Sequence, residues 1–307
     1  MSVQAMAQQV SVAPYYGGRL AALSLTFDDG LQDQYTLAFP ELKRRGLKGT
    51  FAIIGSKVGG MMRSKQDRQD GTDGTPTMTW DQLREMAADE QEIASHGWEH
   101  RPVTRLDAEA LRLEVARNDS AILANIGQRP MTYVYPGNNK SAETVRFCEQ
   151  DRTGSRRQQT SVGSKRTTAY LKNYVDELIA KGQWGVTMTH GIVRGYDHFQ
   201  DPQVLWDFLD DICGRQELLW IAPHRDVAAY IRERDDVRLT VTPTADGYRV
   251  KLATTLNPKI FNHPLTLEVH TPLCHATQDG KSLAIKRVKD VAYVDVNPYG
   301  GEVMLRK

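Results

Sequence analysis

The 307-residue sequence lacks a long apolar run, a large net charge and a cysteine framework. No apolar stretch approaches the roughly 18 residues that a membrane helix needs, so no transmembrane segment is predicted. The 39 basic and 38 acidic residues leave a formal charge of +1, so no overall field favours a nucleic acid or an anionic membrane as partner. Cys148, Cys213 and Cys274 have no metal-ligand spacing, and we expect the first two, which fall in helix-like stretches, to play a buried apolar role.

The N-terminus has only one of the features of a signal peptide. Ala5-Met6-Ala7 before Gln8 has the small-x-small form of a cleavage site, but the basic and apolar regions that normally precede such a site are missing. The match is either chance or the remnant of a clipped signal peptide. We favour the remnant for the lead of residues 1–20, which predicts a periplasmic or secreted protein. Otherwise the protein would be cytoplasmic.

The composition is that of an ordinary globular chain. Hydrophobic residues make up 40% of the sequence and charged residues 25%, which argues against extensive disorder. The length allows one large barrel or two domains.

Apolar and amphipathic stretches alternate between residues 21 and 235. The expected strands cover residues 21–29, 49–55, 91–96, 131–136, 152–157, 184–190 and 217–223, and the expected helices cover residues 35–45, 80–89, 107–126, 141–151, 168–181, 202–214 and 224–234. Seven successive β/α units predict an α/β fold with a distorted, TIM-like (β/α)7 barrel. The polar, glycine-rich residues 59–77 are expected to form a long exposed loop that shapes a substrate groove.

The pattern changes after residue 235. Short alternating runs recur up to residue 307, which predicts a small appended β-sandwich. This region holds none of the candidate catalytic residues named below, so the chemistry is expected to lie in the barrel.

Candidate functional residues gather at the predicted strand ends. The alternating stretch of residues 23–30 ends in Asp28, Asp29 and Gly30, and two adjacent carboxylates need a metal, a cation or a raised pKa. Capping of the next helix is the simpler explanation for such a pair taken alone. However, His96, His100, Pro136, Arg156 and His190 also fall at or just beyond strand ends, where the active sites of such barrels lie.

These residues suggest a division of roles. His96 and His100, if the segment between them turns helically, could bind one divalent ion together with Asp29 and leave a position open for water. Asp28 would then be the general base, held ionised by Arg156, and His190 the general acid. Isolated histidines of this kind are more often surface residues, helix caps or packed rings; the convergence of all of them on one strand edge favours the catalytic interpretation.

Five short motifs resemble those of the polysaccharide deacetylases, also called the NodB homology domain or family four carbohydrate esterases, over about residues 21–233. Thr26-Phe27-Asp28-Asp29-Gly30 matches the first motif, and Ser95-His96-Gly97-Trp98-Glu99-His100 resembles the second. Tyr133-Val134-Tyr135-Pro136-Gly137 is similar to the third without its usual arginine. Gly154-Ser155-Arg156 resembles a variant of the fourth, and Thr189-His190-Gly191 matches the fifth.

The resemblance implies a metal-dependent hydrolase that removes acetyl groups from a carbohydrate, on nitrogen or on oxygen. The ion would most often be Zn²⁺, with Co²⁺, Ni²⁺ or Mn²⁺ as alternatives. It also implies an oxyanion donor at the backbone N–H of Gly137, beside Tyr135 and Pro136, and an acetyl pocket lined by Met188 and Trp220. Trp98, Tyr196 and Trp220 could stack on sugar rings. The rival interpretations are an inactive carbohydrate-binding protein on the same fold and a structural metal site, which would need a fourth ligand.

Overall fold

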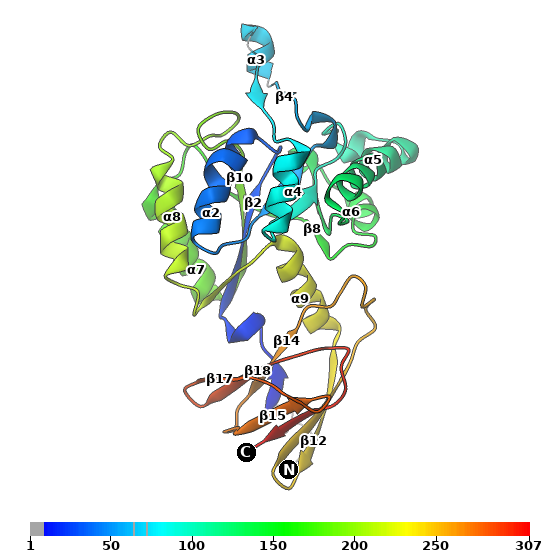
Figure 1. Ribbon diagram of the computed structural model, residues 1–307, viewed down its shortest axis with the longest axis vertical. Coiled ribbons are helices and arrows are strands. Elements are labelled where there is room, and N and C mark those ends of the chain that lie inside the picture. Colours follow the sequence, from blue (N-terminus) through cyan, green and yellow to red (C-terminus); the bar gives the residue numbers. More distant parts are fainter. Residues whose placement is uncertain (1–8, 64, 72) are drawn as a thin grey trace.

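The computed structural model describes residues 9–63, 65–71 and 73–307, so the candidate cleavage site at residues 5–7 lies outside the described residues. A curled parallel sheet covered by helices forms one part of the molecule, and two antiparallel sheets form the other (Figure 1). The predicted α/β fold, a distorted barrel with an appended β-rich region, is confirmed.

All seven predicted strands of the barrel are present, each shorter than expected. They are β2 (Ala21–Phe27), β3 (Thr50–Ile53), β6 (Glu92–Ser95), β7 (Thr132–Val134), β8 (Gly154–Arg156), β10 (Trp184–Thr189) and β11 (Leu219–Ile221). A two-residue strand that the sequence pattern did not indicate, β9 (Thr160–Ser161), pairs with β10. The strand order is β8-β7-β6-β3-β2-β10-β9, with β11 also paired to β2.

The last strand does not close the barrel. Trp220 of β11 and Trp184 of β10 both pair with Ala22, whereas Thr50 of β3 pairs with Thr26. One edge of β2 is therefore occupied by β10, and the other by β11 along its first half and by β3 along its last residues. The sheet curls into an open half-barrel with β8 and β9 at its two ends.

The central strand β2 is buried on both faces. Leu23, Leu25 and Phe27 belong to the apolar core beneath the covering helices. Because side chains alternate along a strand, Ser24 and Thr26 face the other way, into a barrel interior with polar groups; the indole of Trp184 donates to Ser24 Oγ at 3.1 Å. The same alternation directs Asp28, the residue after β2, toward that interior.

Helices cover the outer face of the barrel. They are α2 (Phe39–Arg44), preceded by the π-helical turn η2 (Gln34–Ala38), α4 (Trp80–Ala88), α5 (Ala108–Ile126), α6 (Ala142–Cys148), α7 (Thr168–Lys181) and α8 (Gln203–Cys213). The last helix, α9 (His224–Asp236), lies instead at the N-terminal end of the barrel interior, where His224 contacts Trp184 and Thr132. Capping boxes at Thr79 and Ser141 begin α4 and α6, and Asp107 caps α5. These start signals explain why the sequence pattern located the helices closely.

The described part of residues 59–77 contains short helical and strand elements and is not the uninterrupted loop expected from the sequence. It forms a short hairpin of β4 (Met61–Met62) and β5 (Thr75–Pro76), with α3 (Lys65–Asp70) between the strands. In Figure 1, α3 projects from the end of the barrel away from the antiparallel sheets. Among the described residues, no helix combines the length and apolar character that crossing a membrane requires.

The β-rich region contains two antiparallel sheets. One is ordered β12 (Arg238–Thr244), β13 (Gly247–Ala253), β19 (Val303–Arg306), β15 (His275–Gln278), β16 (Lys281–Ser282). The other is ordered β1 (Val10–Val12), β14 (Leu265–Val269), β18 (Val291–Val296), β17 (Ile285–Val288). The N-terminal lead thus supplies an edge strand to this region, because Val10 pairs with Val269. A short strand so far from its partner in sequence carries no local signal of the pairing.

The barrel and the β-rich region share one apolar core. At their junction Tyr16, Trp220, Tyr230 and His263 form a cluster of rings with centroids 5.1 to 6.4 Å apart. The turn η1 (Tyr16–Gly18) that leads into β2 contacts β14 and β18. The N-terminal ends of the barrel strands therefore face the β-rich region, and their C-terminal ends face away from it.

A buried carboxyl group at this junction predicts a pH-dependent stability. Burial raises the pKa of Glu233 to about 7, although the backbone N–H of His263 donates to it at 3.1 Å and opposes the shift. The cost of ionising Glu233 is absent below about pH 4.5 and complete above about pH 7. We expect Glu233→Gln to raise the free energy of unfolding at pH 8.5 by about 1–2 kcal/mol, a value discounted for solvent screening.

The check is urea unfolding of both proteins at pH 5 and pH 8.5. The gain should shrink toward zero at pH 5, where wild-type Glu233 is already neutral. An equal gain at both pH values would contradict the assignment, because it would mean that the substitution acts through packing.

Candidate metal centre and active site

Asp28 forms a bidentate ion pair with Arg156 inside the mouth of the barrel. Nη1 and Nη2 of Arg156 each donate to one carboxylate oxygen of Asp28 at 2.6 Å, and Nη1 also donates to Thr26 Oγ1 at 2.6 Å. Both side chains are almost fully buried. Burial alone would raise the pKa of Asp28, but the charge and hydrogen bonds of Arg156 outweigh it and hold the pKa well below its usual range. Asp28 is therefore an ionised carboxylate at neutral pH.

Asp29 points toward two histidines. Its φ of +73° begins the turn that Gly30 continues at +67°, so adjacent carboxylates diverge. Oδ1 of Asp29 lies 3.5 Å from Nε2 of His96 and 3.7 Å from Nε2 of His100. One ligand atom from each of the three residues lies within 4.8 Å of the others. Asp29 Oδ1 is buried and has no hydrogen-bond partner among the described residues.

The two histidines are oriented by different means. Nδ1 of His96 lies 2.8 Å from the carbonyl oxygen of Val134, so a proton on Nδ1 leaves the Nε2 lone pair free for an ion. Burial alone would lower the pKa of His96, but the neighbouring carboxylates of Asp29 and Asp28 outweigh it and raise the pKa. Burial lowers the pKa of His100 to about 4, so this ring is neutral at neutral pH.

The helical turn that joint ion binding by the two histidines was supposed to require does not form. Gly97 and His100 both have positive φ values, +80° and +62°, and the segment is an irregular loop. Oε1 of Glu114, on α5, accepts hydrogen bonds from the backbone N–H groups of Glu99 and Arg101 at 2.9 and 3.1 Å. A Cβ on Gly97 would lie 2.6 Å from the same oxygen. The loop is thus held by a helix residue, which a local sequence pattern does not reveal.

The donor set of Asp29, His96 and His100 fits a divalent ion. Two imidazoles and one carboxylate are a common ligand set for Zn²⁺ when an open position is left for water. The unpartnered oxygen of Asp29 is the observation that supports the fit, because a buried carboxylate oxygen normally has a partner. The same set also accommodates other transition metals, so it does not select one ion.

His190 lies beside the Asp28 carboxylate. It follows β10, and its Nε2 is 3.9 Å from Oδ2 of Asp28. The ring of Tyr196 packs edge-on against it, with 4.9 Å between centroids. Its Nδ1 has no hydrogen-bond partner among the described residues. His190 lines the same cavity as Asp28, the residue that its Nε2 approaches.

The segment after β7 forms a 3₁₀ turn, η5 (Pro136–Asn138). Gly137 has a φ of +59°, and a Cβ there would meet no atom within 4 Å. Substitution by alanine would thus be strained by the backbone and not by a clash. Tyr135 and Gly137 line the cavity, while the hydroxyl of Tyr135 donates to Ser155 Oγ at 2.9 Å. Pro136 is buried and begins the turn.

The prediction that Trp220 lines an acetyl pocket beside Met188 is wrong. Met188 pairs with Thr26 of β2, whereas Trp220 pairs with Ala22. Four residues along a strand correspond to about 13 Å. Met188 lines the cavity, and Trp220 instead packs against Tyr16 and Tyr230 in the core shared with the β-rich region. Its position depends on the register of β11, which the sequence pattern does not specify.

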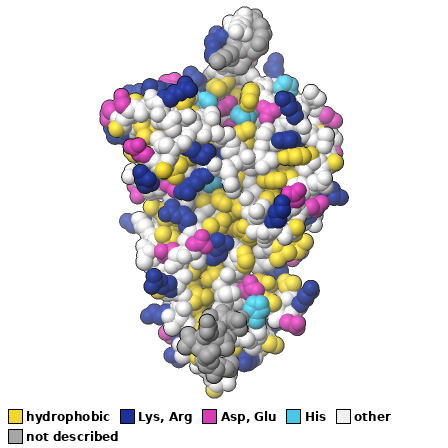
Figure 2. Space-filling model, turned by 180° about the vertical axis from the view of Figure 1, so that it is seen from behind, with side chains coloured by type: hydrophobic (Ala, Val, Ile, Leu, Met, Phe, Trp, Pro, Cys, Tyr) yellow, Lys and Arg dark blue, Asp and Glu magenta, His cyan; other side chains and the backbone are white. Residues whose placement is uncertain are grey.

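A cavity of about 980 Å³ unites the site. The predicted residues that line it are Asp28, Asp29, His96, His100, Tyr135, Gly137, Arg156, Met188 and His190. Met62, Arg63 and Thr75 of the hairpin also line it, as do Asn138 and Tyr196, so the expected groove-forming role of residues 59–77 agrees with their position. In Figure 2, histidine and acidic side chains gather at the end of the molecule away from the β-rich region.

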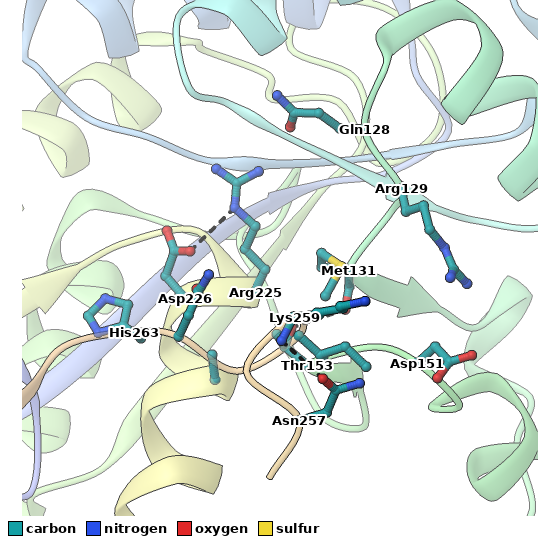
Figure 3. A pocket seen from close by; sticks show the side chains of 13 residues that line it. Gln128, Arg129, Met131, Asp151, Thr153, Arg225, Asp226, Asn257, Lys259 and His263 are labelled. Carbon is teal, nitrogen blue, oxygen red and sulfur yellow. Dashed lines mark hydrogen bonds and ion pairs between the residues drawn. The ribbon is translucent and has the colours of Figure 1, made fainter. Parts of the chain in front are cut away.

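A second cavity, of about 760 Å³, lies at the other end of the barrel, against the β-rich region (Figure 3). Arg129 and Lys259 line it, together with Asp151 and an ion pair in which Arg225 Nε is 3.3 Å from Asp226 Oδ1. These charges nearly cancel. The group of metal-binding side chains found in the described part of the chain lies in the first cavity, which is therefore the candidate active site.

Two residues of the site were not among those predicted. Asp33 and Gln34, at the start of η2, are buried and bond to the segments that carry Asp28 and His190. Two polar residues at the start of a helix are ordinary cap and surface residues in a sequence pattern, so no local signal distinguishes them.

Comparison with known proteins gave consistent matches. Residues 19–151 match the sequence model of the polysaccharide deacetylase family. YxkH of Bacillus subtilis (strain 168), named a "Putative polysaccharide deacetylase", is 28% identical over 126 residues. That alignment covers 41% of this chain and only 40% of the relative, so the matched segment spans less than half of YxkH.

Comparison with solved structures gave matches at low identity. One is a "putative polysaccharide deacetylase" from Mycobacterium smegmatis. Its TM-score is 0.52 at 16% identity, and the match covers 76% of this chain and 98% of that one. A structure from Bacillus anthracis, described as a CE4 family pseudoenzyme, has a TM-score of 0.46 and 14% identity, covering 68% of this chain and 65% of that one.

Removing either histidine should remove the bound ion. We expect His96→Ala and His100→Ala, purified in the presence of Zn²⁺, to retain less than about a tenth of the ion held by the wild type, because two protein ligands hold a catalytic ion poorly. Metal content per chain is measured by mass spectrometry after gel filtration. His270→Ala, an exposed histidine of the β-rich region, is the control and should keep full occupancy. Full occupancy in both site variants would refute the ligand assignment.

Proposed function

Because this chain belongs to the polysaccharide deacetylase family, we propose that it is a metal-dependent hydrolase that removes acetyl groups from a carbohydrate. One observation carries the proposal: the Asp28 carboxylate, the His190 ring and the set of Asp29, His96 and His100 line the same cavity. A base, an acid and an ion site within reach of one another are what acyl hydrolysis requires.

Asp29, His96 and His100 would hold the ion. A bound divalent ion lowers the pKa of water at the site and polarises a carbonyl group, which suits a base as weak as the Asp28 carboxylate. Zn²⁺ is the ion that we propose first, with Co²⁺, Ni²⁺ and Mn²⁺ as alternatives, since two histidines and a carboxylate suit all of these.

The proton transfers would be made by Asp28 and His190. Asp28, kept ionised and oriented by Arg156, takes a proton from the attacking water as the water oxygen bonds to the acetyl carbon. Nε2 of His190 gives a proton to the leaving nitrogen or oxygen as its bond to the acetyl carbon breaks. The products are acetate and a free amine or hydroxyl on the sugar. The 3.9 Å between Asp28 Oδ2 and His190 Nε2 brings both groups within reach of one tetrahedral centre.

The developing oxyanion needs a donor. The backbone N–H of Gly137 is our candidate, because Gly137 lines the same cavity and backbone donors on a fixed turn stabilise an oxyanion without reorganisation. Tyr135, beside it, also lines the cavity. Met188 offers an apolar surface for the acetyl methyl group.

We propose an acetylated carbohydrate as the partner, and an extracytoplasmic location on the strength of the Ala5-Met6-Ala7 pattern. Tyr196, with 69% of its surface exposed at the rim of the cavity, is well placed to stack on a sugar ring. The family contains pseudoenzymes, so an inactive carbohydrate-binding protein is the alternative that the test below must separate.

The direct test is acetate release by the metal-loaded protein from a panel of N-acetylated and O-acetylated glycans. Asp28→Asn should keep the ion and lower kcat by about 10² to 10⁴. This change leaves Arg156 without its anionic partner and should also destabilise the fold, by up to about 3–5 kcal/mol, so the folded fraction must be measured. Glycan binding without acetate release by the wild type would favour the inactive alternative, and wild-type kcat in Asp28→Asn would place the base elsewhere.

His190 can be tested by its dependence on the leaving group. An amine leaves poorly without a proton, whereas the phenolate of an activated aryl acetate leaves unaided. We expect His190→Ala to lower kcat on an N-acetyl sugar by about 10² to 10⁴ but to lower hydrolysis of the aryl acetate by less than about tenfold. Parallel assays on both substrates provide the measurement, with His270→Ala in the β-rich region as a control. An equal loss on the two substrates would show that His190 acts in structure and not as the acid.

A further inference from the structure

Gln34 connects the backbones of the two proton-transfer residues. Its side chain has no exposed surface, and its Nε2 donates to the carbonyl oxygen of Asp28 at 2.6 Å and to that of His190 at 2.9 Å. Both hydrogens of the amide are therefore used. The backbone hydrogen bonds between β2 and β10 end at Asp28, whose N–H donates to the carbonyl oxygen of Thr189 at 2.8 Å. The Gln34 side chain then connects the two chain segments just after these strands, because it bonds to the carbonyl oxygens of both Asp28 and His190.

Asp33 holds the loop that follows His190. Its Oδ2 accepts hydrogen bonds from three successive backbone N–H groups, those of Ile192, Val193 and Arg194, at 2.8, 2.9 and 3.2 Å. Three donors on one carboxylate oxygen form a charge-assisted anchor. The loop is closed on itself by bonds from Gly191 N–H to Tyr196 O and from Phe199 N–H to Ile192 O, both at 3.2 Å.

A residue of this loop, Tyr196, contacts the His190 ring. Nδ1 of His190 has no hydrogen-bond partner among the described residues, and the Asp28 carboxylate lies 3.9 Å from Nε2, beyond hydrogen-bond distance. The side chain of His190 packs against the ring of Tyr196, which lies on the loop that Asp33 anchors. The orientation of His190 therefore depends on its backbone, which Gln34 holds, and on Tyr196, which Asp33 holds through the loop.

We propose that Asp33 and Gln34 are positioning residues that fix the separation and orientation of Asp28 and His190. The proposal rests on the proposed function of that same site. Neither side chain is among the described residues that line the cavity, so neither is expected to touch substrate. Their effect would arise because proton transfer at a single centre tolerates little displacement: an error of about 1 Å can cost about 10²-fold in rate.

The first test replaces Gln34 by methionine, which has a similar volume but no donor. We expect kcat on an N-acetyl substrate to fall about 10- to 100-fold, KM to change less than about threefold, and metal content to stay at the wild-type value. The loss on an activated aryl acetate should be smaller, because that substrate needs His190 less.

Gln91→Met is the matched control. Gln91 is equally buried, and its amide connects the starts of β3 and β6 through Leu47 O at 3.2 Å and Gly49 N–H at 2.7 Å, at the strand ends opposite the site. If Gln34 acted only through structure, both variants would have a lower melting temperature and the same kcat as each other. Wild-type kcat in folded Gln34→Met, or an equal loss in Gln91→Met, would overturn the proposal for Gln34.

Asp33 is tested by hydrogen exchange, which does not require activity. Asp33→Ala should speed amide exchange at residues 192–194 by at least tenfold, and Asp33→Asn, which keeps an oxygen acceptor without the charge, should fall between it and the wild type. Unchanged amide exchange at residues 192–194 in Asp33→Ala would refute the anchoring role of Asp33, regardless of the measured activity. If the wild type releases no acetate from any glycan or aryl ester, the proposed function fails, and altered exchange would still establish the anchor.

Discussion

The site depends on the ion pair between Asp28 and Arg156, buried across the mouth of the barrel. Two charges removed from water at this depth are tolerated because each satisfies the other with parallel hydrogen bonds, and because Thr26 accepts a further one. Removing either partner would leave an uncompensated buried charge. The pair links β2 to β8, which lie four positions apart in the sheet order, so the curvature of the sheet and the ionisation of Asp28 depend on each other.

The strands and the loops contribute different things to this site. Strands place Asp28 and Arg156 because alternation directs their side chains into the polar interior. Two of the remaining groups, Asp29 and His100, lie on a turn and a loop and have positive φ, a conformation that few non-glycine residues adopt. Such turns persist only when neighbours hold them, as Glu114 holds the loop before His100. The ion site is thus a property of several packed elements together.

The β-rich region packs closely against the barrel. Its sheet incorporates β1 from the N-terminal lead, and its core continues into the base of the barrel through Tyr16, Trp220 and Tyr230. The catalytic mouth lies at the opposite strand ends. This arrangement lets the region stabilise the start of β2 without contributing to the cavity, whose described lining residues all come from the first 196 positions.

The sequence by itself determined the seven parallel strands, the helices and the residues that could bind an ion or transfer protons. These features follow from local rules: alternation of apolar residues, capping signals, and the placement of polar groups just after strands. Only the tertiary structure decided that β11 lies beside the first half of β2, that Trp220 belongs to the shared core, that β1 joins a distant sheet, and that Gln34 connects Asp28 to His190. Each of these depends on strand register or on contacts between residues far apart in the chain, and no short stretch of sequence encodes such contacts, because their energies arise only once the elements have packed.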